Sequence, residues 1–157
     1  MAIQNPGEVF KAGSHLQFSV RTHTGVPHLL VRMPSGNFLC YSQPRYSEKD
    51  DVMTYMGQDN TASGGMFAQW TRIYTYGGKI VENACQSLAM DVMARNMLLI
   101  EQAGFDIVLT VHDETVAEAD TDRSAKELSA ILAKPAPWAP GLPLAASGFE
   151  CTRYRKD

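Results

Sequence analysis

Residues His112, Asp113 and Glu114 place an imidazole and two carboxylates next to one another in the chain. They follow an apolar, β-branched run at residues 107–111, which predicts a buried strand, and they precede an alternating run that predicts a second strand with one solvated face. Two strands joined by His112 and Asp113 would form a tight hairpin with Asp113 at its tip. A carboxylate there could bind a divalent metal ion, or it could only accept a local backbone hydrogen bond, as turn aspartates often do.

A hydrolase that used His112 as base and Asp113 as orienting group is the least favoured class of function. Adjacent strand residues point to opposite faces of the sheet. No nucleophile with a fitting motif is visible in the sequence.

The hairpin must be positioned by the segment before it, residues 79–103, which is expected to form one long helix ended by Gly104. Its apolar stripe is predicted to comprise Val81, Cys85, Leu88, Val92 and Leu99. A second arc carries Lys79, Glu82, Asn83 and Gln86 in the first two turns. Such an arc is usually a solvated face, but neutral amides near a helix N-terminus also suit a nucleic-acid backbone or minor groove.

The rest of the chain is expected to supply a β-meander and a short second helix. Strands are predicted from residue 16 onward, with a turn at residues 34–37, after a short helix or turn in residues 1–13. Residues 61–65 have the composition of a flexible connector. Residues 122–134 favour a helix capped by Thr121 or Asp122, and residues 144–150 could add a last strand. These patterns predict an α+β fold with an antiparallel sheet and one long helix.

The length and composition are typical of one soluble globular domain, residues 1–157, with 45% hydrophobic and 20% charged residues. No apolar run is long enough to span a membrane, and the N-terminus has no signal-peptide pattern. Three widely spaced cysteines suit a reducing compartment. The expected location is the cytoplasm, with no membrane partner.

The formal net charge is −3, whereas a self-sufficient nucleic-acid binder is usually basic. Residues 1–80 contain seven Lys/Arg and five Asp/Glu, and residues 81–157 contain seven and twelve. The acidic surplus around the hairpin suits a site for divalent cations but repels phosphates. Any DNA would therefore be held largely by metal ions or by neighbouring basic domains.

The motif Val-His-Asp-Glu at residues 111–114, after a strand and a long helix, resembles motif C of the A-family DNA polymerases of bacteria and phages. The resemblance covers nearly the whole chain and is strongest over residues 74–118. The other segments that carry it are residues 5–7, 30–36, 76–83 with Gln86 and Asp91, 137–146 and 153–157.

This resemblance implies a C-terminal palm fragment, with residues 1–75 as a β-rich insertion and residues 76–157 as the helix, motif C hairpin and tail. It implies that Asp113 binds Mg²⁺ in a two-metal nucleotidyl-transfer site, that Glu114 is a weaker metal ligand, and that His112 lies beside the primer terminus. Gln86 would contact the minor groove of primer–template DNA, with Lys79, Glu82 and Asn83 nearby. Many relatives have Asn where this chain has Glu82, so Asn83 is the alternative there.

Motif A, which carries the second metal-binding carboxylate, and motif B, which binds the incoming deoxynucleoside triphosphate, are not found in the 157 residues. We therefore expect the chain alone to lack polymerase activity and to need a complementary polymerase fragment. The chain could be the product of a truncated prophage gene, one piece of a split polymerase or a cut chain, and the sequence does not distinguish the three. The alternative function is a non-catalytic remnant of the palm fold that binds DNA or such a fragment.

Overall fold

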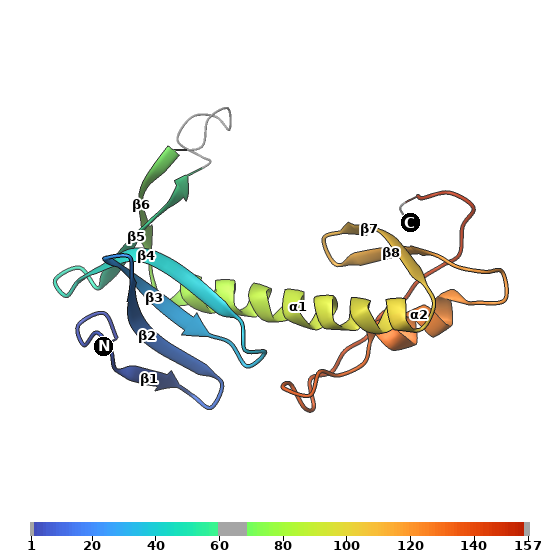
Figure 1. Cartoon of the computed structure of the whole chain (residues 1–157), viewed down its shortest axis with the longest axis horizontal. Helices are drawn as coiled ribbons and strands as arrows, with labels where there is room; N and C mark the ends of the chain where they lie inside the picture. The colour runs from blue at the N-terminus through green and yellow to red at the C-terminus, as the bar shows by residue number, and fades with distance from the viewer. Residues whose placement is uncertain (1, 60–68, 156–157) are drawn as a thin grey trace. The chain divides into compact units, whose positions relative to one another are not determined.

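The computed structural model describes residues 2–59 and 69–155 and has the predicted α+β architecture. Its elements, in chain order, are β1 (Val9–Ala12), β2 (Leu16–His23), β3 (Val26–Arg32), β4 (Phe38–Ser47), β5 (Val52–Asp59), β6 (Gln69–Thr75), α1 (Gly77–Gln102), β7 (Asp106–Val111), β8 (Glu114–Glu118) and α2 (Ala125–Leu132) (Figure 1). The chain forms two compact units, one up to Ser87 and one from Leu88. Helix α1 contributes residues to both of them.

The first unit is built on a six-stranded antiparallel sheet in the order β1-β2-β3-β4-β5-β6, which is the predicted meander extended by two strands. The expected turn before β4 is confirmed. Its Gly36 has a φ of 96° and donates its N–H to the Met33 carbonyl at 3.0 Å, a backbone conformation that favours glycine. The predicted helix or turn near the N-terminus is a turn followed by strand β1, because residues 9–12 pair with β2. The expected connector, residues 61–65, lies outside the described residues.

One face of this sheet forms the core of the first unit. The residues buried there are Val20, Leu29, Val31, Tyr41 and Met53. The first turns of α1 contact this face through Asn83, whose side-chain amide donates a hydrogen bond to the Tyr41 hydroxyl at 3.0 Å. The Tyr41 ring also meets Tyr55 edge to face, with centroids 5.0 Å apart. Tyr41 therefore joins the sheet to the helix that follows it.

A Tyr41→Phe substitution is expected to lower the free energy of unfolding by about 1 kcal/mol, because it removes the hydrogen bond from Asn83. Burial raises the pKa of the Tyr41 phenol, and the hydrogen bond from Asn83 lowers it by less, so that the net shift is upward. The phenol of the unfolded chain ionises at about pH 10. Below that pH the contribution of Tyr41 to the free energy of unfolding is fully present, and it is lost as pH rises through the higher pKa of the folded state. Denaturant unfolding between pH 7 and 11 should show a shallower alkaline loss in the variant. Exposed Tyr76→Phe is the control, and an equal change in it would contradict this account.

Helix α1 is confirmed, but its apolar stripe was predicted incorrectly. The fully buried residues of α1 are Ala84, Val92, Asn96 and Ile100, which with half-buried Leu88 recur every four positions. Val81 is 57% exposed, and Cys85 is also exposed. The first turns approach the sheet through small or polar side chains, which places the larger Val81 outside the contact. The expected stripe is correct only from Leu88 onward.

The second unit has a small core made by the end of α1, the β7–β8 hairpin and α2. Ile100, Phe105 and Ile131 are its buried members, and the half-buried residues packed against them include Ile107 from β7 and Ala117 from β8. Gly104, with a φ of 86°, ends α1 as predicted. The Phe105 N–H bonds the Ile100 carbonyl and the Gly104 N–H bonds the Glu101 carbonyl, which is the Schellman pattern.

Three local predictions for this unit are wrong. Residues 107–111 do form a strand, but it is mostly solvent-exposed, with Val108 at 55%, because its sheet has only two strands and one of its faces lies on the core. Helix α2 is capped by Ser124, whose hydroxyl accepts the Glu127 N–H at 3.2 Å, rather than by Thr121 or Asp122. Residues 144–150 form no strand.

Asn96 is a buried polar residue of α1 that the apolar pattern did not reveal. It is 0% exposed, and its amide donates hydrogen bonds of 2.8 Å to the carbonyls of Leu132 and Lys134. The oxygen of the Asn96 side-chain amide accepts a hydrogen bond from the Arg95 guanidinium at 2.7 Å. Asn96 thus satisfies carbonyl groups at the C-terminal end of α2, which would otherwise lack helical partners.

Within the described residues, no helix combines the length and hydropathy that a membrane-spanning segment needs.

Candidate active site at the β7–β8 hairpin

The hairpin forms as predicted, with His112 and Asp113 as its two turn residues. Val111 pairs with Glu114, and the strands run antiparallel with an irregularity between Ile107 and Leu109. His112 has a φ of 56°, in a region where a residue other than glycine costs about 1–2 kcal/mol. Two-residue hairpin turns usually place Asn-Gly there for this reason. Thr24, Gln43 and Asp51 have similar φ values of 48–50°, so this conformation is not particular to the hairpin turn.

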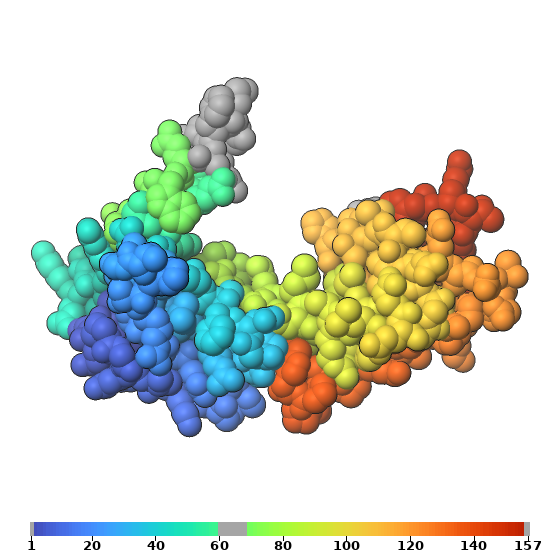
Figure 2. Space-filling view, viewed as in Figure 1, coloured from blue at the N-terminus to red at the C-terminus, as the bar shows by residue number. Residues whose placement is uncertain are grey.

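The turn presents its polar side chains to solvent. His112, Asp113 and Glu114 are all exposed, and the surface of the hairpin is visible between yellow and orange in Figure 2. The Glu114 carboxylate accepts a hydrogen bond from the Tyr154 hydroxyl at 3.4 Å. The prediction that Asp113 is accessible at the turn is confirmed.

The hairpin by itself does not make a magnesium site. Asp113 occupies the turn while Glu114 is the first residue of β8, and across residues 2–59 and 69–155 no three His, Cys, Asp or Glu side chains gather as metal ligands would. Mg²⁺ takes six ligands in near-octahedral geometry and is usually held by one or two carboxylates together with substrate phosphates and water. The two hairpin carboxylates could therefore supply only part of such a site.

The four candidate DNA-binding residues of α1 lie in the first unit. Lys79 forms an ion pair with Glu82 at 2.8 Å, and this hydrogen bond raises the pKa of the Lys79 amine. Both side chains are about half-exposed, so the pair adds little stability. Glu82 and Gln86, one turn apart, are exposed, whereas the Asn83 amide is engaged by Tyr41. Gln86 is therefore the neutral amide of this arc that the fold leaves facing solvent.

The candidates form two groups, one in each unit. Lys79, Glu82, Asn83 and Gln86 share the beginning of α1, and His112, Asp113 and Glu114 share the hairpin turn. A common surface for the two groups stays a prediction. Tyr154, which contacts Glu114, was not singled out from the sequence, where it is only one aromatic residue in a basic tail.

Comparison with known proteins supplies one informative relationship. No protein-family model matches the chain, and no solved structure does. Over 136 aligned residues, 82% of the chain, it is 40% identical to a DNA polymerase of Bacillus phage SP02. The chain spans only 20% of the length of that polymerase. It is therefore similar to one part of a phage DNA polymerase.

Proposed function

We propose that the chain is the motif C part of the palm of a phage-type A-family DNA polymerase and acts in DNA replication. The observation that carries this proposal is the 40% identity over 82% of the chain to a phage DNA polymerase. The accessible His-Asp turn at the tip of an antiparallel hairpin is consistent with it.

In this proposal Asp113 supplies one of the carboxylates that hold the catalytic Mg²⁺ ions, and Glu114 is a weaker ligand. His112 lies beside the primer 3′ terminus. Exposed Gln86 donates to and accepts from the minor groove of the primer–template duplex, with Lys79, Glu82 and Asn83 on the same stretch of helix.

The proposal also requires a partner. A second carboxylate from a motif A segment would complete the metal site, and a motif B segment would bind the incoming deoxynucleoside triphosphate. The exposed apolar side chains of β7, Val108 and Leu109, are suited to being covered by such a segment, because solvent-exposed apolar surface next to a candidate site is typical of an interface.

The test is primer extension by the chain mixed with a polymerase fragment that carries motifs A and B. We expect no extension by the 157-residue chain alone and Mg²⁺-dependent extension by the mixture. Extension by the chain alone would show that it holds a second carboxylate site. Association of the two polypeptides without any extension would favour the alternative function, a non-catalytic palm remnant that binds a polymerase fragment.

The role of α1 gives a separate prediction for the reconstituted polymerase. Gln86→Ala is expected to weaken primer–template binding several-fold, because one hydrogen bond contributes about 1 kcal/mol. Gln102→Ala is the matched control, since it removes the same group from an exposed position at the other end of the helix. Titration of labelled primer–template by fluorescence anisotropy measures both affinities. Equal affinities for the two variants would exclude Gln86 from the DNA contact.

A further inference from the structure

The β1–β6 sheet separates its charges between its two faces. The strand register and the alternation of side chains place Lys11, Arg21, Arg32, Arg45 and Arg72 on the face opposite the core. We call this the outer face. These are all the lysines and arginines of the six strands, and His23 and His28 share their face. Arg21, Arg32 and Arg45 are exposed to solvent.

The described strand residues of the outer face include no carboxylate. Among the described strand residues of the sheet, Asp59 is the one carboxylate, and alternation from buried Met53 places it on the core face. The turn between β4 and β5 carries Glu48, Asp50 and Asp51, and Asp50 lines the same hollow as Arg45. The chain as a whole is acidic, so this local positive surface runs against its net charge of −3.

Exposed aromatic rings accompany the cations. Strand β6 alternates Trp70, Arg72 and Tyr74 on the outer face, and the two aromatic side chains are 64% and 77% exposed. Phe38, across from Arg32 on β4, is also exposed. Arg72 is fixed between the aromatic residues, because it donates hydrogen bonds to the Gln43 carbonyl at 3.2 Å and the Thr54 hydroxyl at 3.1 Å.

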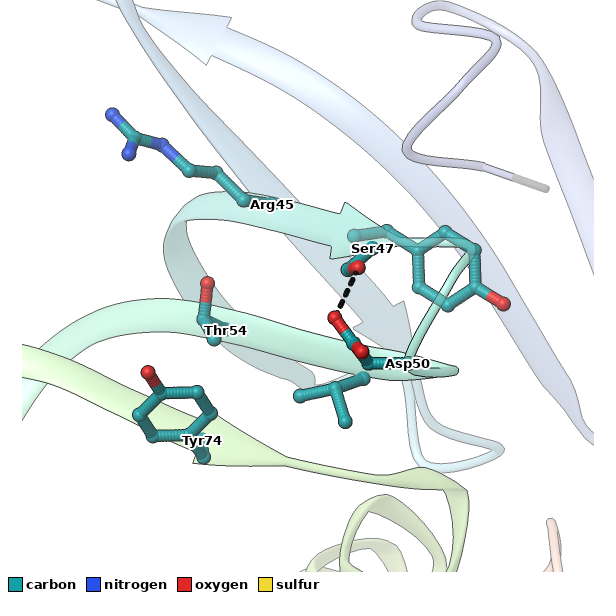
Figure 3. A pocket seen from close by; sticks show the side chains of 7 residues that line it. Arg45, Ser47, Asp50, Thr54 and Tyr74 are labelled. Carbon is teal, nitrogen blue, oxygen red and sulfur yellow. Dashed lines mark hydrogen bonds between the residues drawn. The ribbon is translucent and has the colours of Figure 1, made fainter.

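The outer face is hollowed where β4, β5 and β6 meet. Arg45, Ser47, Thr54 and Tyr74 line this hollow, and Asp50 closes one end while accepting a hydrogen bond from Ser47 at 2.8 Å (Figure 3). A second hollow is lined by Arg45 together with Val26, Pro27, Gln43 and Pro44. Arg45 therefore lines both hollows.

We propose that the outer face binds single-stranded DNA. The cations would neutralise backbone phosphates, and Trp70 and Tyr74, about 13 Å apart along β6, would stack on bases. This combination of a positive surface with exposed rings is how sequence-independent single-strand binders work. A duplex would leave the rings without a partner, because its bases are already stacked on one another. An acidic peptide would use the cations alone.

This site lies in the first unit and goes beyond the proposed function; only the choice of DNA over RNA rests on the similarity to a DNA polymerase. The test measures binding of the full chain to a fluorescein-labelled oligothymidylate by anisotropy. Trp70→Ala and Tyr74→Ala are each expected to weaken binding about tenfold. Arg32→Gln and Arg45→Gln should each lower the slope of log affinity against log salt by about 0.7. Arg72 is left unchanged because it has structural contacts.

Lys126→Gln and Tyr154→Ala are the matched controls, since both residues are exposed but belong to the second unit. They should retain wild-type affinity. Because this assay measures binding of a single strand and not primer extension, failure here and failure of the proposed function are distinguishable. In a Trp138→Phe background, Trp70 is the sole tryptophan, and its fluorescence should be quenched by the oligonucleotide.

Four results would overturn the proposal. They are equal affinity for duplex and single strand, unchanged affinity in both aromatic variants, equal competition by polyglutamate, and tighter binding of oligouridylate than of oligothymidylate. The third would assign the face to an acidic protein partner, and the fourth to RNA. Thermal unfolding of each variant is measured as a control, to distinguish a loss of affinity from a loss of folded protein.

Discussion

Asp113→Asn is expected to reduce primer extension by the reconstituted polymerase by about 10³-fold or more. A metal ion supplies several kcal/mol of transition-state stabilisation, and about 4 kcal/mol corresponds to a factor of 10³ in rate. The substitution keeps the size of the side chain and removes only the charge that would bind Mg²⁺. Because Asp113 is exposed in a turn, the free energy of unfolding should change little.

Asp120→Asn is the matched control, because it makes the same chemical change at an exposed position just beyond β8. Steady-state rates of both variants should be measured over a range of Mg²⁺ concentrations. Activity that survives Asp113→Asn at the wild-type level would show that the hairpin turn has a structural role only.

Asn96→Ala is expected to lower the free energy of unfolding by about 2–4 kcal/mol. The variant loses two hydrogen bonds to carbonyl groups at the end of α2, leaves Arg95 without this acceptor, and opens a small cavity at a site with 0% exposure. Urea denaturation followed by circular dichroism measures the change. Since α2 packs on Ile100 and Phe105, the second unit should be the part that loses stability.

Gln102→Ala serves as the control for Asn96→Ala, because it truncates an exposed amide on the same helix. Its free energy of unfolding should stay within about 0.5 kcal/mol of wild type. A similar loss in the two variants would mean that the buried hydrogen bonds of Asn96 contribute no more than an ordinary surface side chain.

The hairpin and the long helix could be predicted because local patterns specify them. Alternation set the register of β7 with β8, and Gly104 marked the end of α1 through its need for a positive φ. The exposure of β7 could not be predicted in the same way. A run of Ile, Val and Leu indicates that a strand can be buried, but not that it is. Burial of Val108 would need a further strand or layer, which the two-stranded sheet lacks.

The buried face of α1 was misplaced because a single helix packs against different partners in its two halves. A stripe defined by large apolar residues includes Val81 and Cys85, but the contact with the sheet uses Ala84 and the Asn83–Tyr41 hydrogen bond. Asn96 was missed since a polar residue in an apolar stripe gives no sign of its hydrogen-bond partners. The Ser124 cap, by contrast, was visible in the sequence as Ser-x-x-Glu before an apolar run.

The position of the hairpin residues was predictable from the sequence, whereas the roles of the candidate residues stay a prediction. The resemblance pointed to His112 and Asp113, and the structure places both at an accessible turn. The outer face of the N-terminal sheet was not anticipated, because its cations are scattered over sixty residues of sequence and come together only through the strand register. Its one local sign is the alternation of Trp70, Arg72 and Tyr74.

The most direct test of the central claim, that this chain performs the motif C part of a phage DNA polymerase, is a chimera. The matched stretch of the Bacillus phage SP02 polymerase would be replaced by this chain, and primer extension measured with Mg²⁺. We predict template-directed extension that is lost when the chimera carries Asp113→Asn. A chimera that folds and binds primer–template DNA but extends no primer would contradict the claim.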